Sequence, residues 1–73
     1  MSYQIQSIMF PKEEFSLIGA KMWLKNHEYY PLKVDTTQNF YRFRLQKPIK
    51  GNKYRIVHFG DYIMAVIDYG KSA

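Results

Sequence analysis

Basic side chains are concentrated in one short stretch of the chain. Residues 42–55 include six Lys or Arg residues and neither Asp nor Glu, whereas the rest of the chain has five basic and six acidic residues. The formal net charge of +5 therefore arises entirely within this stretch. Guanidinium groups bind phosphate through paired hydrogen bonds, and ammonium groups neutralise its charge. The stretch predicts a polyanionic partner.

An aromatic pattern accompanies these charges in residues 39–46. Tyr41, Phe43 and Leu45 alternate with polar residues at the period of a β-strand, so they should face a core together. Phe40 and the two arginines between these positions should then face away from that core. An exposed ring can stack on a base while arginine and lysine contact phosphate. The predicted nucleic-acid-binding site comprises Phe40, Arg42, Arg44, Lys47, Lys50, Lys53 and Arg55.

Two alternative interpretations use the same surface residues. In the first, Arg42 and Arg44 are solvated strand residues that pair with acids such as Asp61 or Glu28. In the second, the protein binds a viral or host protein, builds part of a virion, or forms a homo-oligomer. Tyrosine and arginine are enriched at the centres of protein interfaces, and the chain has seven tyrosines. The candidates are Tyr29, Tyr30, Tyr62 and Tyr69. No sequence-specific reading of nucleic acid is implied, because the ribonucleoprotein motif is absent from the sequence.

Residues suited to catalysis or metal binding do not form a recognisable pattern. A metal site needs three or more convergent ligands, and His27 and His58 belong to no His, Asp or Glu cluster with ligand spacing. Asp35, Asp61 and Asp68 are best read as turn and strand-end residues, with a two-metal nuclease site as the alternative. There is no glycine-rich phosphate loop. We therefore expect a non-enzymatic protein without a cofactor.

The helix and strands that must position these residues can be predicted from hydrophobic periodicity and from residues that favour helix caps and turns. Ser16 is a suitable N-cap for a helix over residues 17–26, whose apolar stripe places Trp23 in the core. Strands are predicted over residues 3–10, 32–34, 39–46, 53–59 and 62–69, and turns over 35–39, 48–51 and 60–61. The predicted fold class is α+β, with a single helix packed on a mostly antiparallel sheet in the order β-α-β-β-β-β. Residues 1–73 should form one small domain.

The composition limits the cellular setting. The chain has no cysteine, which excludes a disulfide framework and thiolate metal sites. No run approaches the ~18 apolar residues of a membrane span, and the polar N-terminus does not resemble a signal peptide. We expect a cytoplasmic, nuclear or virion-interior protein that is neither secreted nor associated with a membrane. Because so small a core gives only modest stability, self-association is a plausible supplement.

Several short segments resemble a known family. They are residues 6–10, 15–16, 20–25, 34–37, 41–44 and 65–67, together with His27 and Asn39. The chain resembles a small domain that recurs in tailed bacteriophage and large DNA virus proteins, alone or attached to proteins such as capsid-maturation proteases. The Trp-Leu-Lys and Tyr-Arg-Phe-Arg cores, at residues 23–25 and 41–44, are the most specific parts. The resemblance implies a viral source and a non-enzymatic accessory role. One departure is Leu45, which separates Arg44 from Gln46, where the family places Gln directly after the second Arg.

Overall fold

Five antiparallel strands and one helix make up the fold. The structure, a computed structural model, describes residues 3–71. Its elements, in chain order, are β1 (Gln4–Pro11), α1 (Leu17–Asn26), β2 (Lys33–Thr36), β3 (Phe40–Arg44), β4 (Asn52–His58) and β5 (Met64–Lys71). The strands form one sheet in the order β2-β3-β1-β5-β4. The predicted α+β class and element order are confirmed, and β5 is an interior strand.

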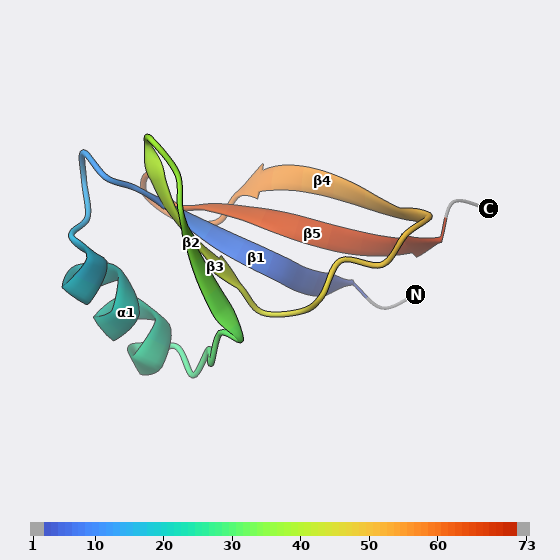
Figure 1. The fold of residues 1–73 in the computed structure, drawn as a ribbon, viewed down its shortest axis with the longest axis horizontal. Helices are drawn as coiled ribbons and strands as arrows, with labels where there is room; N and C mark the ends of the chain where they lie inside the picture. Colours follow the sequence, from blue (N-terminus) through green and yellow to red (C-terminus); the bar gives the residue numbers. More distant parts are fainter. Residues whose placement is uncertain (1–2, 72–73) are drawn as a thin grey trace.

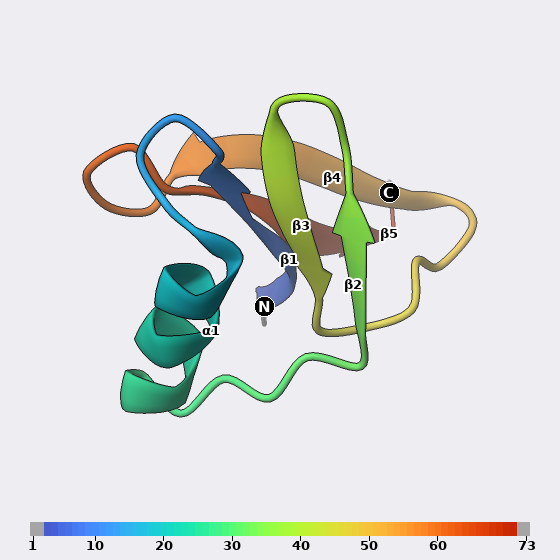
Figure 2. The same ribbon diagram turned by 60° about the vertical axis from the view of Figure 1, so that its left-hand side comes forward.

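The helix covers only part of the sheet. Figure 1 shows α1 at one end of the long axis, whereas the start of β1 and the end of β5 lie at the other. Figure 2 shows β2 as the outer strand of the sheet, with β3 between it and β1. The chain measures 39 × 24 × 21 Å along its principal axes. The end away from the helix will be called the distal end.

The core lies between α1 and one face of the sheet. Phe10 is completely buried and contacts the rings of Phe15, Trp23 and Phe43 edge-on, with centroid separations of 5.1, 5.5 and 5.5 Å. Edge-to-face contacts of this kind add to the stabilisation from buried apolar area. Trp23 is half-buried against the core, as the helical stripe predicts. The fully enclosed core comprises Ile8, Phe10, Ala20, Leu24, Phe43, Ile63 and Ala65.

The predicted helix is confirmed with its cap. Ser16 has an extended backbone, and its Oγ accepts a hydrogen bond of 3.0 Å from the Gly19 N–H. This bond satisfies one of the donors that the first helical turn leaves free. Within residues 3–71, no helix is long and apolar enough to cross a membrane.

Every strand begins and ends one or two residues from its predicted limits, and two of these differences have a clear physical reason. β2 continues through Asp35 and Thr36, which pair with Arg42 and Tyr41 of β3, although a turn was expected there. Pairing with β3 overrides the weak strand propensity of these residues, since strand propensity depends on context. β5 begins at Met64 because Tyr62 has a φ of 68°, which is incompatible with a strand.

Candidate functional site

The two faces of β3 have the chemistry that its alternation predicts. Phe43 pairs with Ile8 in the register of β1 and β3, and both side chains belong to the core beneath α1. Tyr41 and Leu45 also pack against that core. Because neighbouring strand residues point to opposite faces, Arg42 and Arg44 lie on the face away from the helix.

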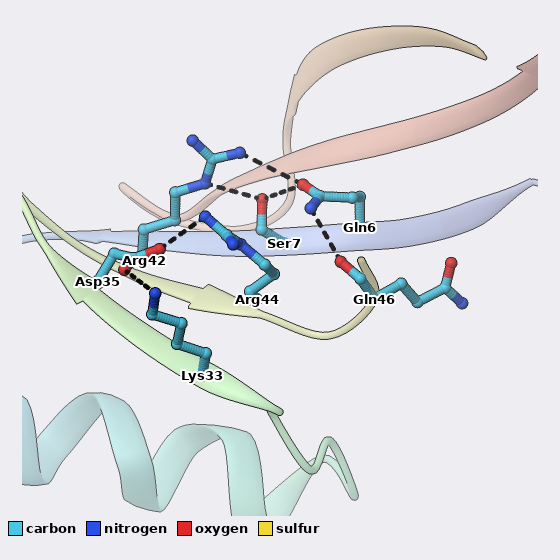
Figure 3. A network of polar contacts seen from close by, with 7 residues as sticks. All are labelled: Gln6, Ser7, Lys33, Asp35, Arg42, Arg44 and Gln46. Carbon is cyan, nitrogen blue, oxygen red and sulfur yellow. Dashed lines mark hydrogen bonds and ion pairs between the residues drawn. The ribbon is translucent and has the colours of Figure 1, made fainter. Parts of the chain in front are cut away.

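Arg42 is bonded to two buried polar residues of β1. Its Nε donates to Ser7 Oγ at 3.2 Å and its Nη2 to Gln6 Oε1 at 3.3 Å. Ser7 Oγ in turn donates to Gln6 Oε1 at 2.8 Å, and Figure 3 shows the three side chains converging over β1. Ser7 and Gln6 are 0% and 2% exposed, so Arg42 satisfies polar atoms that water does not reach.

Gln6 links this network to the segment that leaves β3. It is the extra residue of a bulge between β1 and β5, since Ile5 pairs with Ile67 and Ser7 with Val66. Gln6 Nε2 donates to the Gln46 carbonyl at 2.9 Å, and the Gln6 carbonyl accepts from the N–H groups of residues 45 and 46. The bulge thereby fixes where the chain departs toward β4.

Arg44 is engaged in an ion pair. Its Nη2 lies 2.8 Å from Asp35 Oδ2, and the weaker contact of Lys33 Nζ to Asp35 Oδ1 is 3.7 Å (Figure 3). Pairing with an acid is one of the alternative interpretations of Arg44, but its partner is Asp35 and neither of the acids named as examples, Asp61 and Glu28. The difference arises because Asp35 belongs to β2, which pairs with β3, and not to a turn.

Phe40 lies apart from the basic turn. It is half-buried at the start of β3, pairs with Pro11, and its N–H donates to Thr37 Oγ1 at 3.0 Å in the β2–β3 turn. Together with Pro11, Lys12, Glu13, Gln38 and Asn39 it lines a shallow hollow.

Arg55 does not join Arg42 and Arg44. The predicted site groups Arg55 with Arg42 and Arg44, but the structure does not bring them together, because β1 and β5 lie between β3 and β4. Arg55 pairs with Ile67 and shares a strand face with Val57, which packs against the helix-side core. It is therefore on the face opposite to Arg42.

The remaining predicted cations gather at the distal end. The connection from β3 to β4 passes the start of β1 and the end of β5 before β4 begins (Figure 1). Asn52, at the start of β4, pairs with Lys71 at the end of β5, so Lys71 is a cation of this end that sequence reasoning missed. All the cations of this end are exposed. The distal basic cluster comprises Lys47, Lys50, Lys53, Arg55 and Lys71.

The distal basic cluster has no acidic neutraliser. No ion pair involves any of its five members within the described part of the chain, residues 3–71. The nearest strand carboxylate, that of Asp68, is 5% exposed and accepts hydrogen bonds from Asn52 Nδ2 at 3.0 Å and the Gly70 N–H at 2.8 Å. This carboxylate is therefore held inward, whereas the five cations of the cluster are exposed.

Aromatic side chains adjoin the cluster. The Arg55 guanidinium carbon lies 5.6 Å from the centroid of the Tyr69 ring, which contacts the Tyr3 ring edge-on at 4.8 Å. Tyr3 is 60% exposed, so its ring is accessible to a ligand. The connecting loop is itself braced, because Tyr54 Oη donates to the Ile49 carbonyl at 3.1 Å and accepts from its N–H at 2.6 Å.

The acidic residues considered for metal chemistry do not converge. Asp35 is in β2 and Asp68 is in β5, with β3 and β1 between them. Among residues 3–71, no group of three or more His, Cys, Asp or Glu side chains is arranged to hold a metal ion. The expectation of a non-enzymatic protein stays a prediction.

Comparison of the chain with protein-family models, curated proteins and solved structures finds no match. The resemblance to a viral domain therefore stays a prediction as well.

Proposed function

We propose that the protein binds nucleic acid through the phosphate backbone, using the distal basic cluster. The observation that carries this proposal is the gathering of five exposed cations at one end of the sheet, without an ion-paired acid among residues 3–71. Cations that are not neutralised within the protein release the counterions of a polyanion when they bind it, and this release supplies most of the affinity of non-specific binding.

Arg42 and Arg44 stabilise the fold in this proposal and do not contact phosphate. Arg44 would have to leave Asp35 to contact a phosphate, and Arg42 would have to leave buried Ser7 and Gln6. An unpaired buried polar group costs about 1–3 kcal/mol, which opposes such a rearrangement. Exposed lysines of the distal end face no comparable cost.

Tyr3 and Tyr69 give the proposed interface a platform for bases. Stacking on an aromatic ring contributes about 1–3 kcal/mol per base and tolerates any sequence. Phosphate contacts likewise carry no sequence information. The proposed activity is therefore binding of single-stranded or unpaired nucleic acid without sequence preference. The resemblance to a viral domain supports a setting in virus-infected cells or virions, as an accessory protein.

Electrophoretic retardation of generic DNA and RNA at low salt tests the proposal. We expect the wild-type protein to retard both, and a Lys50→Gln/Lys53→Gln variant to retard them much less. A Lys21→Gln/Lys25→Gln variant removes the same charge from exposed positions of α1 and should behave like the wild type. Absence of retardation by the wild type would overturn the proposal.

A second candidate function is binding to another protein. Exposed large apolar side chains favour it, among them Tyr30 at 74%, Ile18 at 71% and Leu32 at 67%. Ile18 is in α1, and Tyr30 and Leu32 lie in the segment between α1 and β2. Tyr30 also lines a hollow with Tyr3, Gln4 and Gln46, so this surface borders the distal end.

A further inference from the structure

A mostly apolar groove separates α1 from β2. Its volume is about 450 Å³, within the range of about 300–1,000 Å³ typical of ligand sites. Leu24 and Phe43 form its buried floor. Its outer wall comes from Tyr30, Leu32 and Val34, which are 74%, 67% and 40% exposed. Such a concentration of exposed apolar side chains on a small protein indicates an interaction surface.

The strand that borders this groove has a free edge. Among residues 3–71, β2 is the outermost strand and pairs only with β3. The Thr37 N–H donates to the Phe40 carbonyl at 2.9 Å, which sets the phase of the β2–β3 ladder. Because bonded and non-bonded pairs alternate in an antiparallel ladder, the backbone groups of Val34 and Thr36 point away from β3. An edge of this kind accepts an additional strand.

The charge around the groove indicates which kind of added strand would bind there. Lys21 and Lys25 are exposed on the α1 side, and no Asp or Glu is among the lining residues. Lys33 also borders the groove, but its Nζ is held 3.7 Å from Asp35. An acidic segment complements this rim. A second copy of the chain, with its net charge of +5, would instead bring like charges together.

We propose that the groove binds an acidic, extended peptide segment of another protein, which adds as a strand to the free edge of β2. Apolar side chains of the segment occupy the groove above Phe43, and acidic side chains contact Lys21 and Lys25. Main-chain bonds to Val34 and Thr36 supply affinity, and the groove with its lysine rim supplies selectivity. None of the residues that line the groove belongs to the distal basic cluster.

Selection from a displayed library of random peptides about a dozen residues long, against the full chain, tests this inference. We expect enriched sequences to carry apolar residues two positions apart, with Asp or Glu beside them. Fluorescence polarisation of an enriched peptide should show about tenfold weaker binding or more for Thr36→Pro, which removes an edge N–H without changing the groove lining. Lys21→Glu/Lys25→Glu should weaken it by a similar factor.

Matched controls separate this site from the distal end. Lys50→Glu/Lys53→Glu makes the same change of charge away from the groove and should leave peptide affinity unchanged, while far-UV circular dichroism verifies the fold of every variant. The inference is overturned if no sequence is enriched, or if enriched peptides lack acidic residues or ignore Thr36→Pro. Concentration-dependent dimers by light scattering that Thr36→Pro abolishes would also overturn it, since they would make a second copy the occupant.

Discussion

Arg44 and Asp35 join the edge strand to the rest of the sheet. Arg44 Nη2 lies 2.8 Å from Asp35 Oδ2, and the side chains are 30% and 31% exposed. The two residues are on adjacent antiparallel strands, where Asp35 is opposite Arg42 and Arg44 is opposite Lys33. A residue whose type suggests phosphate binding therefore holds the short strand β2 in place, beside the groove that this strand borders.

Asp35→Ala should lower the free energy of unfolding by about 1–3 kcal/mol. The substitution leaves the half-buried Arg44 guanidinium without its carboxylate. Because both side chains are partly exposed, the loss of stability should stay below the roughly 3–5 kcal/mol that breaking a fully buried pair costs. Urea denaturation followed by circular dichroism measures the change.

Lys33→Ala is the matched control for this pair. Lys33 contacts the same carboxylate at 3.7 Å with 63% of its side chain exposed, so its removal should change stability by less than about 1 kcal/mol. Equal losses for the two substitutions would contradict a specific role for the Arg44 contact.

Arg42→Met should destabilise the fold by about 1–3 kcal/mol, because buried Ser7 and Gln6 lose a donor that water cannot replace. Arg55→Met makes the same chemical change at an exposed position of β4 and should stay within about 0.5 kcal/mol of the wild type. Thermal and urea unfolding of the two variants provide the comparison. A loss of stability in Arg55→Met as large as in Arg42→Met would argue against the buried network.

Ser16→Ala should cost about 1 kcal/mol of stability, because the Gly19 N–H loses its acceptor at the start of α1. Ser16→Asp keeps an acceptor oxygen at the cap and should retain nearly full stability. Urea midpoints of the two variants test this ordering, and similar losses in both would mean that the cap bond contributes little.

The local patterns of the sequence predict the fold well. Alternation in residues 39–46 predicts which side chains of β3 enter the core, and the spacing of Ala20, Trp23 and Leu24 predicts the buried face of the helix. Both signals depend on residues that are close in the chain. The end of β2 was harder to predict, because Asp35 and Thr36 are typical of turns and become strand residues only through their pairing with β3.

The arrangement of the candidate site depends on strand order, which the sequence does not reveal. Arg42 and Arg55 belong to one basic stretch, yet two strands separate them and they face opposite sides of the sheet. The hydrogen bonds from Arg42 to Ser7 and Gln6 join residues that are 35 and 36 positions apart in the sequence. Lys71 is not part of the predicted site because it is distant in sequence from the basic stretch. Its pairing with Asn52 nevertheless places it at the distal end.

The salt dependence of binding to a labelled single-stranded oligonucleotide tests the proposed function most directly. If all five cations of the distal basic cluster neutralise phosphates, the logarithm of the association constant should fall with the logarithm of salt concentration with a slope of about −3.5, at roughly 0.7 per phosphate. Lys50→Gln/Lys53→Gln should make that slope shallower by about 1.4, and Lys21→Gln/Lys25→Gln should leave it unchanged. Absence of binding at about 50 mM salt, or an equal change of slope in both variants, would contradict the assignment of nucleic-acid binding to the distal end.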